Sequence, residues 1–217
     1  MPAKREIQLR AVHTQDLILA QALRLFNENG AERVTVRHIA REVGISHGNL
    51  CYHFPNTDIL IRRLYEQLAD RLNAEFAGIL AHSTLSLPFL LQFTRATMDL
   101  LYEYRFLMLD FVAVMRRIEP LRTHYRALQR VRSAQFRQLL DGLVEAGWLC
   151  PEPLPGQFDA LKEQATLFGD FWIASAEILY EGVEQGKRAH YLRLFTALLV
   201  PYLTEKGLEA YQQLDFS

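Results

Sequence analysis

The sequence predicts an all-α protein in which a small N-terminal domain of three helices is joined by a long helix to a larger helical domain. Two observations carry this prediction. Apolar residues recur at helical spacing along most of the 217 residues, and no stretch alternates apolar and polar residues as a half-buried strand does. Gly and Pro also interrupt the chain where those helices should end. We place the boundary after residue 60, which gives domains of residues 1–60 and 61–217.

The first predicted helix spans residues 14–29 and follows a polar, loose arm of residues 1–13. Gly30 comes directly after the last helical residue, where a helix often ends on a glycine. One face of this helix is apolar, as expected for a helix that packs on a core. That face consists of Leu17, Ile18, Ala22, Leu25 and Phe26.

Residues 35–54 contain two short helices joined by a tight turn. Thr35 can cap the first helix, Gly44 can end it, and Ser46 can cap the second helix only two residues later. Two helices joined so closely must cross steeply, which is the helix-turn-helix arrangement that reads DNA. The buried side of the first helix is Val36, Ile39, Ala40 and Val43, and that of the second is Leu50 and Phe54.

The remainder of the chain is also predicted to be helical. A long helix of residues 57–81 connects the two domains, since its length carries it well beyond the first three helices. A loop with three prolines at 151–156 is the clearest break that follows. The other predicted helices span about 86–104, 105–118, 119–147, 158–181 and 187–199, with a short one after Pro201.

The composition fits an ordinary globular protein, with half of the residues apolar and a net charge of −1. No run approaches the roughly 18 apolar residues of a membrane span, and no secretory signal is visible. Cys51 and Cys150 form neither a zinc motif nor a disulfide framework. We therefore expect a cytoplasmic protein that needs no membrane.

Charge is distributed unevenly along the chain. Residues 1–65 hold nine Lys and Arg against six Asp and Glu, whereas residues 66–217 hold 15 against 19. A mildly basic front suits a domain that faces DNA, although chance alone also gives so small an imbalance.

Residues 14–60 resemble the DNA-binding domain of the tetracycline-repressor (TetR) family of bacterial regulators. The resemblance covers about a fifth of the chain and rests on many spaced features at once. Two positions depart from the family pattern: Cys51 stands where the family usually has an aromatic residue, and Thr57 stands where it often has Lys. The matching stretches are 25–30, 34–36, 39–40, 44–46 and 48–56.

The resemblance implies which residues contact bases. Arg37 matches a position that often reaches a guanine edge or a phosphate, and Asn49 can pair with adenine through two hydrogen bonds. Gly48 allows the helix backbone to approach the bases, and His47 contacts a base edge or a phosphate. For Arg37 and His47 the alternative is an exposed surface side chain without a partner.

The resemblance also implies which residues contact the DNA backbone. Tyr52, His53 and Thr35 match positions that touch phosphates, and Cys51 and Thr57 occupy two more of them. Thr35 can cap its helix with or without such a contact, and His53 can instead support the turn that follows. For Cys51 the alternative to a redox switch is simply a small residue in the place of an aromatic one.

An effector pocket in the second domain would combine an apolar lining with a few polar groups. The candidates are Met98, Phe111, Met115, His124, Phe168 and Trp172, with Arg95, Asp99, Asp110 and Asp170 as further polar groups among the aromatic residues. For each of them the alternative is a place in the core, a subunit interface, a salt bridge or a solvated face.

The resemblance implies a homodimer that represses transcription at a palindromic operator until a small molecule releases it. We expect the dimer to form through residues 158–182 and 187–205, because these long helices carry many apolar residues. Those residues include Leu167, Phe171, Ile178, Leu194, Leu198 and Leu199.

Enzyme signatures are missing from the sequence, which has no GxSxG, GxGxxG, P-loop or HExxH motif and no Cys/His metal cluster. We expect no enzyme activity, no cofactor and no metal. Three alternatives remain open: a DNA-binding regulator without a ligand, an activator, and a helical enzyme or carrier with a vestigial helix-turn-helix.

Overall fold

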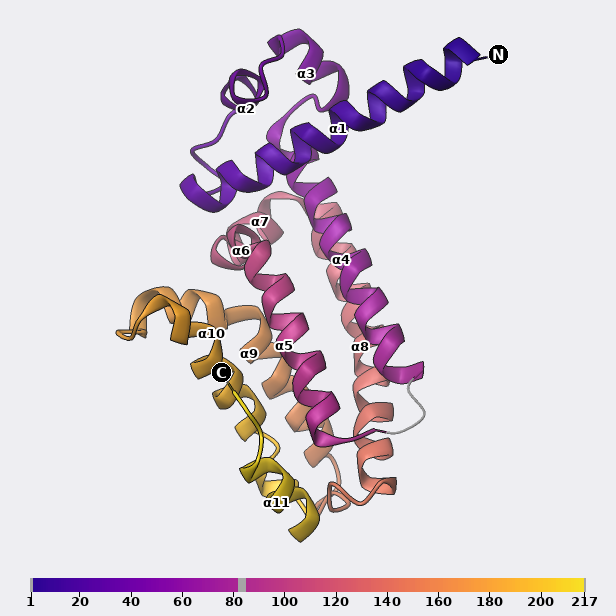
Figure 1. The fold of residues 1–217 in the computed structure, drawn as a ribbon, viewed down its shortest axis with the longest axis vertical. Coiled ribbons are helices and arrows are strands. Elements are labelled where there is room, and N and C mark those ends of the chain that lie inside the picture. Colours follow the sequence, from indigo (N-terminus) through magenta and orange to yellow (C-terminus); the bar gives the residue numbers. More distant parts are fainter. Residues whose placement is uncertain (1, 82–84, 217) are drawn as a thin grey trace. The chain divides into compact units, whose positions relative to one another are not determined.

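The computed structural model describes residues 2–81 and 85–216, with side chains from His13 onward. Residues 1, 82–84 and 217 of the two expected domains therefore lie outside the described part. The described residues form eleven α-helices, one short 3-10 helix and a single isolated bridge between Leu149 and Leu203, which confirms the all-α prediction (Figure 1). The helices are α1 (Pro2–Asn29), α2 (Val36–Val43), α3 (His47–His53), α4 (Thr57–Ala81), α5 (Leu87–Glu103), α6 (Arg105–Leu109), α7 (Phe111–Arg117), α8 (Glu119–Glu145), α9 (Gln157–Leu179), α10 (Glu184–Ala197), η1 (Val200–Tyr202) and α11 (Glu205–Gln212).

The chain divides into two compact units that do not follow the expected boundary at residue 60. The first unit comprises the chain up to Ala69 together with Tyr104–Leu121, and the second comprises Asp70–Glu103 together with the chain from Arg122 onward. The first unit thus contains α6 and α7 in addition to the N-terminal helices. The long helix α4 contributes residues to both units.

Helix α1 begins at Pro2, so the expectation of a loose arm over residues 1–13 is wrong for residues 2–13. The reason is local composition. After Pro2 these residues include Ala, Lys, Arg, Glu, Gln and Leu, which are strong helix formers, and contain no further Pro or Gly. Farther along α1, Ile18 and Phe26 are completely buried, and α1 packs against α2, which in turn packs against α3.

Helices α2 and α3 form the predicted helix-turn-helix. The hydroxyl of Thr35 accepts a hydrogen bond from the His38 N–H at 3.2 Å, and that of Ser46 accepts one from the Asn49 N–H at 3.1 Å. Between them Gly44 has a φ of 77°, a left-handed conformation that glycine adopts without a steric penalty. Ile39 and Leu50 are both completely buried, so each helix directs its opposite side to solvent.

The segment after α5 is two short helices rather than the single predicted helix of residues 105–118. Asp110 separates α6 from α7, and its carboxylate accepts a hydrogen bond from the Ala31 N–H at 3.0 Å. Asn27 Oδ1 in turn accepts one from the Phe106 N–H at 3.1 Å. Asp110 therefore satisfies a backbone N–H just after α1, and Asn27 satisfies one at the start of α6.

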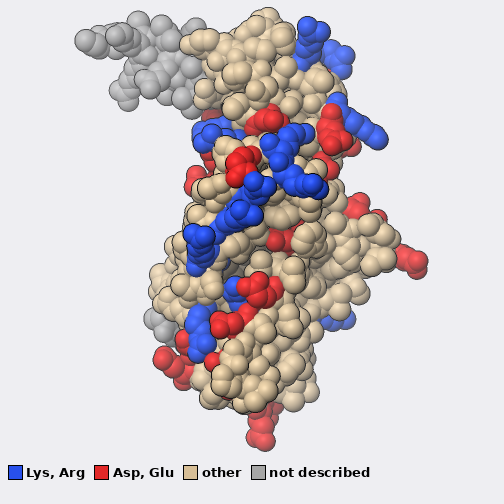
Figure 2. Space-filling model, turned by 180° about the vertical axis from the view of Figure 1, so that it is seen from behind, with Lys and Arg blue, Asp and Glu red and all other residues tan. Residues whose placement is uncertain are grey.

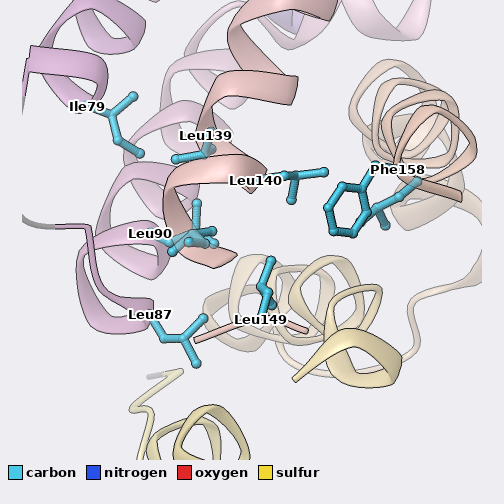
Figure 3. Packing of buried hydrophobic residues seen from close by; sticks show 9 residues of the cluster. Ile79, Leu87, Leu90, Leu139, Leu140, Leu149 and Phe158 are labelled. Atoms are coloured by element: carbon cyan, nitrogen blue, oxygen red, sulfur yellow. The ribbon is translucent and has the colours of Figure 1, made fainter. Parts of the chain in front are cut away.

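The second unit is a bundle of long helices around an apolar core. Residues from α4, α5, α8 and α9 meet there, and Leu149 joins them from the segment after α8 (Figure 3). These buried residues are Ile79, Leu87, Leu90, Leu139, Leu140, Leu143, Leu149, Phe158 and Leu161.

The end of the chain is fastened to the end of α8. Thr204 caps α11 by accepting a hydrogen bond from the Gly207 N–H, and its hydroxyl also donates to the Gly147 carbonyl at 2.8 Å. A Cβ atom on Gly207 would lie 2.3 Å from the Trp148 carbonyl oxygen, so this close approach requires glycine. Within the described residues no helix is both long and apolar enough to cross a membrane.

Candidate functional site

The exposed side of α3 presents three consecutive small or polar residues to solvent. His47, Gly48 and Asn49 are exposed in the first turn of the helix, whereas Leu50 is buried and anchors it. Near the other end of α3, Tyr52 is 83% exposed, an unusual position for a large aromatic side chain. A helix with this arrangement offers hydrogen-bonding groups at one end and a phenol at the other.

Arg37 lies exposed in the first turn of α2. It forms no hydrogen bond or ion pair with any described residue, in contrast to Arg24, which pairs with Glu28 and Glu42. A guanidinium has five N–H donors in a planar fork that matches a guanine edge or a phosphate. Arg37 is therefore available for such a contact.

Two of the expected phosphate contacts have close neighbours of their own, and a third is partly buried. His53 Nδ1 lies 3.5 Å from Gln15 Nε2 of α1, so this ring supports the packing of α3 on α1. Cys51 Sγ lies 3.4 Å from His47 Nε2, one turn away on the same helix. Thr57 is the first residue of α4 and is partly buried.

All nine expected DNA contacts thus lie within the first unit, on α3 or at the N-terminal ends of α2 and α4. Thr35 and Ser46 cap the N-terminal ends of α2 and α3 and so fix where each helix begins. Asn56 does the same for α4, because its side-chain oxygen accepts a hydrogen bond from the Ile59 N–H at 3.0 Å. The structure places these residues as the sequence predicts, while their contacts with DNA stay predictions.

Of the six expected effector contacts, Phe168 and Trp172 lie in one aromatic group of the second unit. The Trp172 ring stacks on Tyr102 with centroids 6.1 Å apart, and it lies 5.7 Å from the Tyr191 ring. Phe168 lies 6.2 Å from the same Tyr191 ring. Trp172 is 2% exposed, and its indole N–H has no acceptor among the described residues. A buried donor without an acceptor carries a desolvation cost that a hydrogen bond from it to a ligand would remove.

The other four expected effector contacts lie elsewhere. Phe111 and Met115 belong to α7 in the first unit, and His124 is exposed on α8. Met98 is buried and lines a cavity of about 150 Å³ between α5 and α10, whose rim carries Arg95 and Arg188. The spacing of these residues in the sequence could not show that they lie apart from Phe168 and Trp172 in the fold.

The polar residues found among the aromatic ones have structural partners. Asp110 accepts the Ala31 N–H, and Arg188 donates to Asp99 at 2.7 Å. Arg95 donates to the Asp215 carbonyl at 2.8 Å. Only the contact between Arg188 and Asp99 is a salt bridge, whereas Asp110 and Arg95 bind backbone groups.

Asp170 is the most unusual of these groups, because burial raises its pKa to about 6 from the ordinary 3.8. The Tyr125 hydroxyl donates to Asp170 Oδ2 at 2.5 Å, which opposes the effect of burial by stabilising the carboxylate. The folded protein therefore holds this proton to a higher pH than the unfolded chain does. Stability that is present below pH 3.8 is lost as the pH rises through about 6.

We expect Asp170→Asn to remove this pH dependence. An amide oxygen still accepts the Tyr125 hydrogen bond but cannot ionise, so the variant should be more stable than the native protein above pH 6. The difference is at most about 3 kcal/mol, from about 1.4 kcal/mol per unit of pKa. Urea unfolding at pH 5 and pH 7.5 measures it. The same stability difference at both pH values would contradict the assignment.

Sequence reasoning did not identify the tyrosines that surround Trp172. Tyr102 and Tyr191, whose rings lie against Trp172, come from two different helices, so no spacing in the sequence links them. It also missed an apolar cavity of about 30 Å³ between α5, α8, α9 and α10, which is smaller than any effector. In the described part of the chain, no group of three His, Cys, Asp or Glu side chains is placed to hold a metal ion.

Comparison with known proteins agrees with this geometry. Residues 18–64 match the family described as "Bacterial regulatory proteins, tetR family", and residues 67–211 match "Bacterial transcriptional repressor" of the TetR type. A TetR-family transcriptional regulator from Marinobacter aquaeolei VT8 has a TM-score of 0.82 and 26% identity, with 92% of this chain and 97% of that one covered.

More distant structures share the fold. The ketosteroid transcriptional regulator KstR2 of Mycobacterium tuberculosis has a TM-score of 0.66 at 18% identity, covering 88% of this chain and 95% of that one. SmeT in its complex with triclosan has a TM-score of 0.61 at 17% identity, covering 89% and 93%.

Fold and site together define a helix-turn-helix protein that binds DNA. The chain belongs to the TetR family and is a DNA-binding transcriptional regulator. The family and the fold are those of transcriptional regulators rather than of enzymes.

Proposed function

We propose that the protein is a homodimeric repressor in the cytoplasm that binds a palindromic operator and releases it when a small molecule binds. The observation that carries this proposal is the exposure of His47, Gly48 and Asn49 in the first turn of α3, together with the exposed, unpaired Arg37 in the first turn of α2. One such helix contacts too few bases to select a genomic site. Two helices related by a twofold axis read twice as many.

We assign base reading to Arg37, His47, Gly48 and Asn49, and contact with the backbone to Thr35, Cys51, Tyr52, His53 and Thr57. The Thr35 hydroxyl accepts the His38 N–H and can still donate its own proton to a phosphate. The high exposure of Tyr52 supports its role, since its hydroxyl is free to reach a phosphate. Residues 1–60 then act as the functional DNA-binding domain, and residues 61–217 as the regulatory domain.

The dimer is proposed to form through α9 and α10, because each presents apolar side chains to solvent. Leu167, Phe171 and Ile178 of α9 are 60%, 41% and 79% exposed, and Leu194 of α10 is 45% exposed. Leu198 and Leu199, which were also expected at the interface, instead pack partly against the core of their own unit. Exposed apolar faces of this kind mark protein–protein interfaces.

The effector is proposed to bind in the second unit beside Trp172. The supporting observation is its buried indole N–H without an acceptor, within a group of aromatic rings. An aromatic or other apolar molecule that carries a hydrogen-bond acceptor fits such a site. SmeT, which shares the fold, is known in a complex with triclosan.

A gel shift with the DNA upstream of its own gene, combined with sedimentation, tests this function. We expect a dimer at micromolar concentration that retains one fragment in an excess of random duplex. A dimer that binds all fragments equally would indicate a vestigial helix-turn-helix. A monomer would contradict the proposed assembly.

We further expect Thr57→Lys to strengthen binding to all DNA sequences alike. Thr57 is the first residue of α4, and the family often has a Lys there that touches the backbone. A new phosphate contact should steepen the slope of log K against log salt by about 0.9 per contact. Affinities for operator and scrambled duplex at several salt concentrations measure it. A change in preference without a change in slope would show that this position does not face a phosphate.

A further inference from the structure

The segment that joins α9 to α10 combines acidic and apolar side chains at the surface. Residues 177–184, which we call the α9–α10 turn, contain three Glu and no Lys or Arg. Ile178, Leu179 and Val183 are 79%, 71% and 72% exposed. Glu181 is exposed and forms no ion pair or hydrogen bond with any described residue. The turn therefore presents an unsatisfied acid beside apolar area.

Helix α8 shows the opposite charge. Its residues 121–140 contain five Arg and neither Asp nor Glu, although the second unit as a whole is acidic. Arg132 and Arg137 have partners, since Arg132 donates to Asn73 and Arg137 pairs with Asp141. Arg126 and Arg130 are exposed and have no partner among the described residues.

Arg126 and Arg130 lie one helical turn apart and repel each other, which costs the isolated helix some stability. Val131, beside them, is 54% exposed. We call Arg126, Arg130 and Val131 the α8 patch. The α8 patch and the α9–α10 turn are therefore complementary. Each combines charged and exposed apolar side chains, and the two charges are opposite.

The two surfaces lie on opposite sides of the second unit. In Figure 1 the α9–α10 turn projects on one side while α8 runs along the other. Figure 2 shows Lys and Arg side chains gathered on the α8 side, and Asp and Glu side chains on the projecting turn at a similar level. The turn of one chain therefore cannot reach the α8 patch of the same chain.

We propose that the α9–α10 turn of each protomer docks on the α8 patch of a second copy, with Glu181 between Arg126 and Arg130. This inference rests on the proposed dimer through α9 and α10. A twofold axis that runs along the bundle exchanges its two sides, so it brings each turn to the α8 side of the other copy. The same contact then occurs twice in the dimer.

This contact mainly determines which chain can serve as the dimer partner and how the two chains are aligned. Opposite charges at the edge of an interface favour one register and exclude unrelated chains, while the apolar faces of α9 and α10 supply most of the affinity. A TetR-type chain that lacks this pair of patches would meet unmatched charge and pair less well with this one.

Charge reversal tests the proposal. The α8 variant is Arg126→Glu with Arg130→Glu, and the turn variant is Glu181→Arg. Each alone should raise the dimer dissociation constant about tenfold, because exposed ion pairs are individually modest but the contact occurs twice. A chain with all three changes should return to near the native value, since both surfaces are then reversed.

Mixing the two variants gives the sharpest result. In a mixed dimer both contacts unite opposite charges, whereas each homodimer contains two repulsive ones. Native mass spectrometry of an equimolar mixture should therefore show the mixed dimer well above the half expected for random pairing. Glu209→Arg makes the same charge change as the turn variant at an exposed position on α11, and it should not favour mixed dimers.

The outcomes separate this inference from the proposed function. A monomeric native protein would contradict the dimer itself. A native dimer with random pairing of the two variants would overturn the inference and leave the dimer in place. An unchanged dimer whose α8 variant loses DNA affinity would show that the α8 patch faces DNA, which also overturns it. All substituted side chains are exposed, and circular dichroism confirms that each variant folds.

Discussion

Leu167→Asp should convert the dimer to monomers and lower operator affinity at least 100-fold. Leu167 is 60% exposed on α9, on the face proposed to meet the second copy. A carboxylate buried there without a partner costs about 3–5 kcal/mol, and the twofold axis brings two such charges into one interface. A monomer then holds only one half-site, so the loss of dimerisation appears as a loss of operator binding.

Leu154→Asp is the matched control for this change. Leu154 is 63% exposed in the loop between α8 and α9, away from the proposed interface. Its variant should remain dimeric and bind the operator like the native protein. Analytical ultracentrifugation at micromolar concentration and a gel shift measure both properties. If Leu167→Asp stayed dimeric with native operator affinity, the α9 face would not form the interface.

Asn49→Ala and Arg37→Ala should each reduce the discrimination between operator and random DNA. A good base contact contributes about 1–3 kcal/mol of discrimination, and every change occurs twice in a dimer. Asn49→Ala should affect random DNA less than Arg37→Ala does, because it removes no charge. Operator and scrambled-duplex affinities at one salt concentration measure both effects.

Tyr52→Phe provides the contrast, since it removes a hydroxyl that is proposed to meet the backbone. Affinity for the two duplexes should fall by similar factors, which leaves the preference intact. An unchanged operator-to-scrambled ratio in Asn49→Ala would show that α3 does not read bases through this residue.

Local features of the first unit could be predicted from the sequence because their causes are local. Capping by Thr35 and Ser46 and the exit at Gly44 depend on residues at most three or four positions apart. Periodicity likewise located the long helices α4, α8 and α9, with ends within a few residues of the observed ones. The buried side of each short helix then determined which residues face solvent.

Contacts between distant segments could not be predicted in this way. The hydrogen bond between Asp110 and the Ala31 N–H joins residues 79 positions apart, at the residue that separates α6 from α7. Likewise, Gly207 has no local signal that it must approach the Trp148 carbonyl. The six effector candidates do not form one pocket for the same reason. Helical spacing identifies the apolar face of a helix, but it does not show which other helix packs against that face. Only Phe168 and Trp172 lie in the same aromatic group.

The prediction of a loose N-terminal arm was wrong for a different reason. The polar character of residues 1–13 predicts a loose arm. The helix propensity of residues 2–13 is nevertheless high, and these residues continue α1 without a break. Polar composition alone therefore did not distinguish a helix from a loose arm.

The central claim is that a symmetric dimer reads DNA through two copies of α3. Sequencing the genomic fragments that the native protein retains tests this claim most directly, with Asn49→Ala as the parallel sample. We predict an inverted repeat whose half-sites lie about one helical turn, or a small multiple of it, apart, on the same side of the duplex. The Asn49→Ala protein should enrich that repeat much less. Fragments without a shared inverted repeat, or an identical repeat from both proteins, would contradict the account.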